Sequence, residues 1–212
     1  MSPRRRTVEP PVEVHSVLPR RTRSVAVRGA LVDAAVRVLE RDGLVGLTVR
    51  AVAAEAGVAP MGVYNHFEGK DGLILAVLER GFDGLREAIT IRPGPPALDR
   101  IRASGIGYRT FALANPITYE LMFGRSVAPE IHERLTPHSK PALGALVDLV
   151  AQAQREATVR EGDPMSLAIQ IWSAVHGAVS LELSGSIPEP EQAETIYGGL
   201  CEAVLIGLAA QQ

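Results

Sequence analysis

The chain has 212 residues, of which 46% are hydrophobic, and a formal net charge of −2. This length and composition can bury one core or two small ones, which excludes an intrinsically disordered protein, and the near-neutral charge argues against nonspecific coating of nucleic acid. The single Cys201 excludes an internal disulfide framework, and the Cys and His spacing fits no metal site, so we expect a reducing, cytoplasmic setting with no metal or cofactor.

Residues 1–24 form a basic segment that contains several prolines. Large apolar side chains are few here, so the segment cannot repay the entropy of ordering, and we expect a flexible basic arm. The arm is either a solvated tail, which we favour, or a contact for the DNA minor groove. No apolar run follows the paired arginines, and no later run is long enough to span a bilayer, so we expect neither export nor a membrane partner.

Residues 25–70 carry the pattern of a three-helix DNA-binding domain. Apolar residues recur at helical spacing up to Gly43, which is a natural left-handed C-cap. Thr48 then caps a short helix, the period breaks at Gly57, and a second short helix opens at Pro60. Two short helices joined by a tight turn with a glycine predict a helix-turn-helix.

The second short helix of this motif, predicted from Pro60 to Phe67, is the element expected to enter the major groove. Met61, Gly62 and Asn65 occupy the positions that reach base edges, and an Asn amide can read adenine with two hydrogen bonds. Hydroxyl, imidazole and ammonium groups nearby suit phosphate oxygens. Tyr64 as a buried core aromatic and His66 as an ordinary surface histidine are the alternatives. The predicted DNA-binding set is Thr48, Pro60, Met61, Gly62, Tyr64, Asn65, His66 and Lys70.

A set of residues in this stretch carries a family resemblance: Thr48, Val52-Ala53, Gly57-Val58, Tyr64, His66-Phe67, Lys70 and Leu73. With them, the region from about Arg28 to Leu78 resembles the DNA-binding domain of the TetR family of bacterial transcriptional regulators. The sequence departs from the family pattern at two positions. Ala59 stands where a Ser or Thr usually caps the second helix of the motif, and Gly62 stands where a side chain often contacts bases.

Residues 71–92 keep a helical period to about Ile89 and predict a connector helix. The proline-rich stretch 93–96 ends it and marks the boundary to a larger all-α region, residues 95–212. The helices expected there end at Asn115, cover 119–123, and begin at about Pro141, at Pro164 and at Glu191. The resemblance implies that the connector transmits a ligand signal. This signal changes the separation of the two helix-turn-helix motifs in a dimer.

The helices predicted at 164–184 and 191–210 favour a homodimer. The first is apolar on two sides: Met165, Ile169, Trp172, His176, Val179 and Leu183 line one side, and Leu167, Ile171, Ala174, Ala178 and Leu181 line the other. A helix apolar on both sides must be buried on both sides. In the second, small residues such as Gly199 and Ala203 permit close approach of another helix. We therefore expect a four-helix interface about a two-fold axis.

Bulky side chains in the C-terminal region are expected to converge on an apolar pocket with a few polar groups. The predicted ligand-binding set is Tyr108, Phe111, Tyr119, Met122, Phe123, Leu146, Leu149, Trp172 and His176. The alternative is that most of these are packed core. The spacings Tyr108-x-x-Phe111-Ala112-x-x-x-Pro116-x-x-Tyr119-x-x-Met122-Phe123 and Trp172-x-x-x-His176-Gly177 also resemble one branch of TetR-type regulators, which implies an inducer-binding domain.

An enzyme is the competing class, and the spacing of the candidate residues argues against it. His176 and Glu182 point to different sides of a helix, Cys201 has no His nearby in sequence, and no phosphate loop or nucleophile elbow is present. A helical ligand-binding protein without operator binding is the other alternative. We predict no catalytic residues and a regulator of double-stranded DNA: a repressor released from a palindromic operator by a small apolar inducer.

Overall fold

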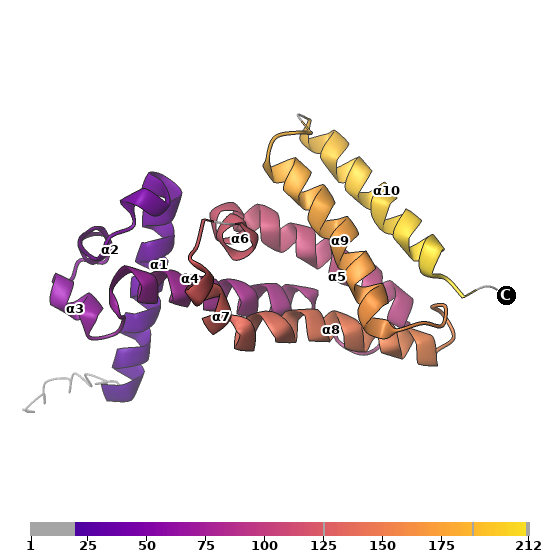
Figure 1. The fold of residues 1–212 in the computed structure, drawn as a ribbon, viewed down its shortest axis with the longest axis horizontal. Coiled ribbons are helices and arrows are strands. Elements are labelled where there is room, and N and C mark those ends of the chain that lie inside the picture. Colours follow the sequence, from indigo (N-terminus) through magenta and orange to yellow (C-terminus); the bar gives the residue numbers. More distant parts are fainter. Residues whose placement is uncertain (1–19, 125, 188, 211–212) are drawn as a thin grey trace, which may run out of the picture.

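The computed structural model describes residues 20–124, 126–187 and 189–210. These residues form helices and no strand apart from an isolated bridge between Val159 and Ala209 (Figure 1). The helices are α1 (Arg20–Gly46), α2 (Val49–Glu55), α3 (Pro60–Tyr64), α4 (Gly69–Ile89), α5 (Ala97–Ala114), α6 (Pro116–Phe123), α7 (Pro129–Arg134), α8 (Thr136–Arg155), α9 (Pro164–Leu183) and α10 (Pro190–Leu208). The predicted all-α class, with an N-terminal helix-turn-helix and a larger helical C-terminal part, is confirmed.

Helices α1, α2 and α3 gather at one end of the molecule, around the start of α4 (Figure 1). Each helix supplies apolar side chains to a shared core, in which Leu39, Val52, Val63 and Leu73 are almost completely buried. A helix as short as α3 is not stable alone in water. Its position therefore depends on burying Val63 against the longer helices.

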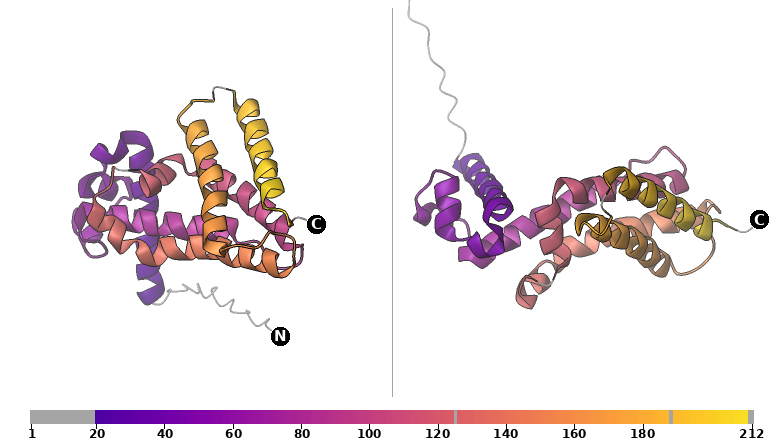
Figure 2. Two further views of the ribbon diagram at one scale, coloured as in Figure 1. Left: turned by 45° about the vertical axis from the view of Figure 1, so that its right-hand side comes forward. Right: turned by 90° about the horizontal axis from the view of Figure 1, so that it is seen from above.

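Helix α4 is the connector between the two parts of the molecule (Figures 1 and 2). Its first half contributes Leu73 and Leu78 to the core under α1, α2 and α3. Its second half buries Phe82, Leu85 and Ile89 in the C-terminal part, where α4 packs against α5 and α8. One buried cluster thus runs along α4 from the helix-turn-helix into the C-terminal part.

The C-terminal part is a layered arrangement in which α9 and α10 run antiparallel on the outside of α5 and α8 (Figure 2). A second buried cluster includes Ile101, Val150, Leu167 and Leu205 and ties these helices together. A nearly buried ion pair adds to this packing, because the Arg109 guanidinium donates to both Glu182 carboxylate oxygens at 2.8 and 2.7 Å. No helix within the described ranges has the length and apolarity needed to cross a bilayer.

The structure differs from the expected elements at several places. Residues 1–19 of the predicted arm lie outside the described residues, whereas residues 20–24 belong to α1 rather than to a flexible segment. Gly43 has the expected positive φ of 66°, but helical structure continues beyond it to Gly46. Helix α8 begins before Pro141, and α7 was not expected at all.

Candidate functional site

The turn between α2 and α3 has the geometry expected of a helix-turn-helix. Thr48 caps α2, with its hydroxyl oxygen accepting from the Ala51 N–H at 3.1 Å. After α2 the chain reverses through Gly57, whose φ of 67° is accessible to glycine without strain. Helix α3 then opens at Pro60, whose missing N–H costs nothing in a first turn. We call α2, this turn and α3 the reading head.

Helix α3 presents one buried side and one exposed side. Val63 is buried, whereas Pro60, Met61, Tyr64 and Asn65 are exposed. Tyr64 is 56% exposed, so the alternative that it is a buried core aromatic is wrong. The predicted helix to Phe67 is too long, because α3 ends at Tyr64 and Asn65 forms its C-cap.

The remaining predicted DNA contacts lie around the rim of the reading head. Gly62 is half-buried, and a Cβ placed there would lie 3.6 Å from the Val58 side chain. His66 is half-buried beside the Phe67 ring, at a centroid distance of 6.4 Å. Lys70 lies in the first turn of α4, and its Nζ donates to the Leu44 carbonyl at 2.6 Å. Lys70 therefore also holds the start of α4 against the end of α1.

Arg50 is a candidate that sequence reasoning missed. It lies in the first turn of α2, is exposed, and has no ion pair with any of the described residues. Arg37 and Arg41, by contrast, both pair with Glu55, at 2.7 and 2.9 Å. The signal that could have identified Arg50 is its position two residues after the cap, in the helix that crosses the DNA backbone in this motif.

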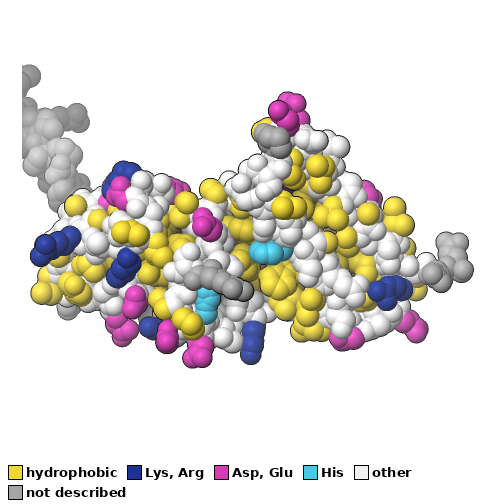
Figure 3. All heavy atoms as spheres, turned by 45° about the horizontal axis from the view of Figure 1, so that its top comes forward, with side chains coloured by type: hydrophobic (Ala, Val, Ile, Leu, Met, Phe, Trp, Pro, Cys, Tyr) yellow, Lys and Arg dark blue, Asp and Glu magenta, His cyan; other side chains and the backbone are white. Residues whose placement is uncertain are grey.

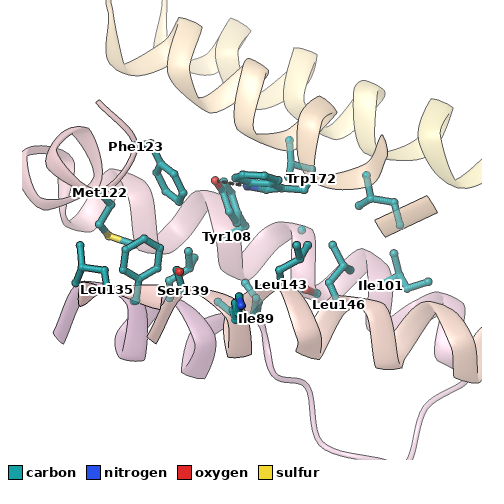
Figure 4. A pocket seen from close by; sticks show the side chains of 18 of the residues that line it. Ile89, Ile101, Tyr108, Met122, Phe123, Leu135, Ser139, Leu143, Leu146 and Trp172 are labelled. Carbon is teal, nitrogen blue, oxygen red and sulfur yellow. Dashed lines mark hydrogen bonds between the residues drawn. The ribbon is translucent and has the colours of Figure 1, made fainter. Parts of the chain in front are cut away.

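A cavity of about 380 Å³ lies in the C-terminal part of the molecule (Figure 4). Five of the predicted ligand-binding residues line it: Tyr108, Met122, Phe123, Leu146 and Trp172. They come from α5, α6, α8 and α9, so the cavity is walled by helices far apart in sequence.

Four of the predicted ligand-binding residues do not line the cavity: Phe111, Tyr119, Leu149 and His176. Phe111 packs against α4, where its ring lies 3.1 Å from a Cβ placed on Gly84. Leu149 belongs to the second buried cluster. These two residues are packed core, as the alternative interpretation held.

Tyr119 and His176 stand behind the cavity wall in a hydrogen-bonded network centred on Tyr108. The Tyr108 hydroxyl accepts from Trp172 Nε1 at 3.1 Å and lies 2.9 Å from the Tyr119 hydroxyl. His176 Nδ1 lies 3.0 Å from the Tyr108 hydroxyl and 2.7 Å from the Tyr119 hydroxyl. The network fixes the orientation of two cavity-lining side chains, Tyr108 and Trp172.

The groups of this network are held in their neutral forms. Burial raises the pKa of Tyr108 and of Tyr119 and lowers the pKa of His176. Because burial disfavours the charged form of each group, the phenols stay protonated and the imidazole stays unprotonated at neutral pH. The cavity therefore has a rigid, uncharged polar wall on this side.

Sequence reasoning missed the cavity residues of the connector and of the segment from α7 into α8. The connector contributes Phe82, Leu85 and Ile89, and the later segment contributes His132, Leu135, Ser139, Lys140, Ala142 and Leu143. The helical period of α4 marked its apolar residues as buried but gave no sign that a cavity lay beside them. No group of His, Cys, Asp or Glu residues in the described part of the chain is arranged to hold a metal ion.

Comparison with known families assigns both parts of the molecule. Residues 31–77 match the family described as "Bacterial regulatory proteins, tetR family", and residues 101–204 match "Tetracyclin repressor-like, C-terminal domain". The chain belongs to the TetR family. As a TetR-family protein it is a transcriptional regulator rather than an enzyme, which confirms the choice between these two classes.

Individual proteins and solved structures are also similar to this chain. An uncharacterised HTH-type transcriptional regulator of Mycobacterium tuberculosis, Rv0681, is 26% identical over 159 residues, which cover 74% of this chain and 71% of that protein. The solved structure of a Rhodococcus sp. RHA1 protein of unknown function matches with a TM-score of 0.76 and a sequence identity of 27%. The match covers 86% of this chain and 95% of the Rhodococcus chain. The SmeT–triclosan complex shares the fold at 22% identity, with a TM-score of 0.65 and coverages of 88% and 93%.

Proposed function

We propose that this TetR-family regulator is a cytoplasmic, homodimeric repressor that leaves a palindromic operator when a small, largely apolar molecule fills its cavity. The observation that carries the proposal is the double role of α4. Phe82, Leu85 and Ile89 of α4 line the cavity, and Leu73 and Leu78 of the same helix lie in the core under the reading head. A displaced α4 would therefore move the reading head with it.

The ligand acts by shifting a population between two arrangements of the molecule. It must bind the arrangement that cannot fit the operator more tightly than the one that can, since equal affinity for both would shift nothing. A cavity wall made partly by α4 supplies the required difference in contacts. SmeT, which has the same fold, has been solved with triclosan, and this supports a ligand-binding role for the C-terminal part.

The exposed side of the reading head supports a division of labour on DNA. Met61, on α3, and Asn65, just after it, are exposed and are proposed to read base edges. Gly62 lies between them in sequence and has no side chain, so it is proposed to let the DNA approach the helix backbone closely. Pro60 opens the helix that carries them. Thr48, Tyr64, His66 and Lys70, together with Arg50, are proposed to contact phosphates.

The outer face of α9 and α10 supports the proposed dimer, in which two copies form a four-helix interface. Figure 3 shows apolar side chains over the upper right part of the molecule, whereas most of the charged side chains in this view lie to the left and below. Ile169 and Leu181 of α9 and Ile196 and Ile206 of α10 are between 43% and 75% exposed. The predicted grouping of α9 side chains into two sides was partly wrong, however. Val179 of the first side is buried together with Leu167 and Ile171 of the second, whereas Leu181 of the second side is exposed.

The DNA-reading roles are tested by comparing Asn65→Ala with Arg50→Ala on duplexes that the native protein selects from a random pool. We expect Asn65→Ala to change which base is preferred at one position of each half-site, because a base contact discriminates between bases by about 1–3 kcal/mol. We expect Arg50→Ala to weaken binding to all duplexes and to reduce the salt slope by about one for each protomer.

Fluorescence anisotropy at several salt concentrations measures both effects. Equal loss on every duplex with Asn65→Ala would contradict a base-reading role for that residue. An unchanged salt slope with Arg50→Ala would remove Arg50 from the phosphate contacts.

A further inference from the structure

The cavity has an uneven distribution of charge. Among the described residues that line it, Lys140 is the only Lys or Arg, and none is an Asp or Glu. Lys140 is exposed at the cavity edge and pairs with no carboxylate of the described residues. Its ammonium group is therefore available to a ligand.

Two further polar groups come from the same short segment of chain as Lys140. Ser139 precedes it in α8, and His132 lies in α7. The Nδ1 atom of His132 is buried and has no hydrogen-bond partner within the described residues. Buried polar atoms almost always have a partner, so an orphaned ring nitrogen at a cavity wall indicates a place for a polar ligand group.

The remainder of the cavity offers mainly apolar surface. Figure 4 shows Leu143, Leu146 and Ile101 together at one end of the cavity, with Tyr108 and Trp172 across from Ser139. A volume of about 380 Å³ lies at the small end of the range for cavities that enclose drug-sized ligands. The cavity thus combines polar and cationic groups from residues 132–140 with a largely apolar remainder.

We propose that the cavity selects amphipathic monoanions, with a carboxylate at Lys140 and an apolar body along Leu143 and Leu146. This inference rests on the proposed function, because it names the chemical class of the effector. One ammonium group matches a single negative charge, whereas a dianion would bring a second charge that no lining cation of the described residues neutralises. Aromatic walls also suit a cation, but Lys140 lines this cavity and no carboxylate does so in the described part of the chain, which disfavours a cation.

Three probes with the same eight-carbon chain separate these classes: octanoate, 1-octanol and octylamine. Trp172 is the chain's only tryptophan and lines the cavity, so its fluorescence reports occupancy directly. We expect octanoate to bind about five- to tenfold more tightly than octanol, because an ion pair with Lys140 that is partly exposed to water adds only modest affinity. We expect octylamine to bind most weakly, because its charge has the same sign as that of Lys140. Added salt should reduce the advantage of octanoate over octanol.

Substitution of Lys140 locates the charge recognition. In Lys140→Gln the preference for octanoate over octanol should disappear, and in Lys140→Arg it should persist. Arg155→Gln is the matched control, because it removes an exposed cation of the same helix that does not line the cavity. Circular dichroism confirms that each variant is folded.

The outcomes distinguish this inference from the proposed function. Octanol or octylamine binding as tightly as octanoate, or a preference that survives Lys140→Gln, overturns the inference alone, since the cavity would still accept a ligand. A Trp172 signal that responds to none of the three probes overturns the inference and the assignment of the cavity as an effector site together.

Discussion

The Ile206→Glu protein is expected to be monomeric and to bind a selected operator at least about 100-fold more weakly than the native protein, because joint binding by two linked heads is lost. Ile206 is 75% exposed on the outer face of α10, alongside the small residues Gly199 and Ala203. In the proposed interface a glutamate there would be buried without a partner, at a cost that apolar packing cannot offset.

Light scattering after size-exclusion chromatography gives the mass, and fluorescence anisotropy gives the operator affinity. Ile206→Leu is the control and should remain dimeric, since it keeps an apolar side chain of the same size. An Ile206→Glu protein that stays dimeric at micromolar concentration would place the interface elsewhere on the molecule.

The Gly107→Ala protein is expected to lose about 1–3 kcal/mol of unfolding free energy, as overpacked sites do. A Cβ at Gly107 in α5 would lie 2.1 Å from the carbonyl oxygen of Ala88 in α4. Both are parts of helical backbone, so no side-chain rotation relieves the collision. Helix α4 must move away from α5, and with it the wall of the cavity.

Urea denaturation measures this loss, and Gly144→Ala is the matched control. Gly144 lies in α8, and nothing lies within 4 Å of a Cβ placed there. Alanine is favoured over glycine inside a helix by up to about 1 kcal/mol, so Gly144→Ala should be as stable as the native protein or more stable. Equal stability of the two variants would show that α4 and α5 do not cross closely at this point.

The helix-turn-helix could be predicted from sequence because its determinants are local. The Thr48 cap, the Gly57 turn and the proline at the start of α3 each act within a few residues. The end of α3 could not be predicted in this way, since the apolar spacing continues to Phe67 while the helix ends at Tyr64. Phe67 is buried from the segment that leads into α4 instead.

The cavity was only partly predictable, because its lining depends on how separate helices are placed. Tyr108 and Trp172 line the cavity, but His176, which was predicted on the same face of α9 as Trp172, does not line it and bonds to Tyr108 instead. The start of α8 was missed because proline usually marks a helix start. Pro141 instead lies inside α8, in its second turn. Its missing N–H removes one backbone hydrogen bond, and the helix continues across it.

The coupling between the cavity and the reading head is tested most directly by one titration with two signals. The operator-bound protein is titrated with the tightest of the three eight-carbon probes, while Trp172 emission reports the cavity and operator anisotropy reports the DNA. We expect both signals to change with one midpoint, and the operator to lower the affinity for the probe by the same factor by which the probe lowers the affinity for the operator. A cavity that fills completely while the operator stays bound with unchanged affinity would contradict the account.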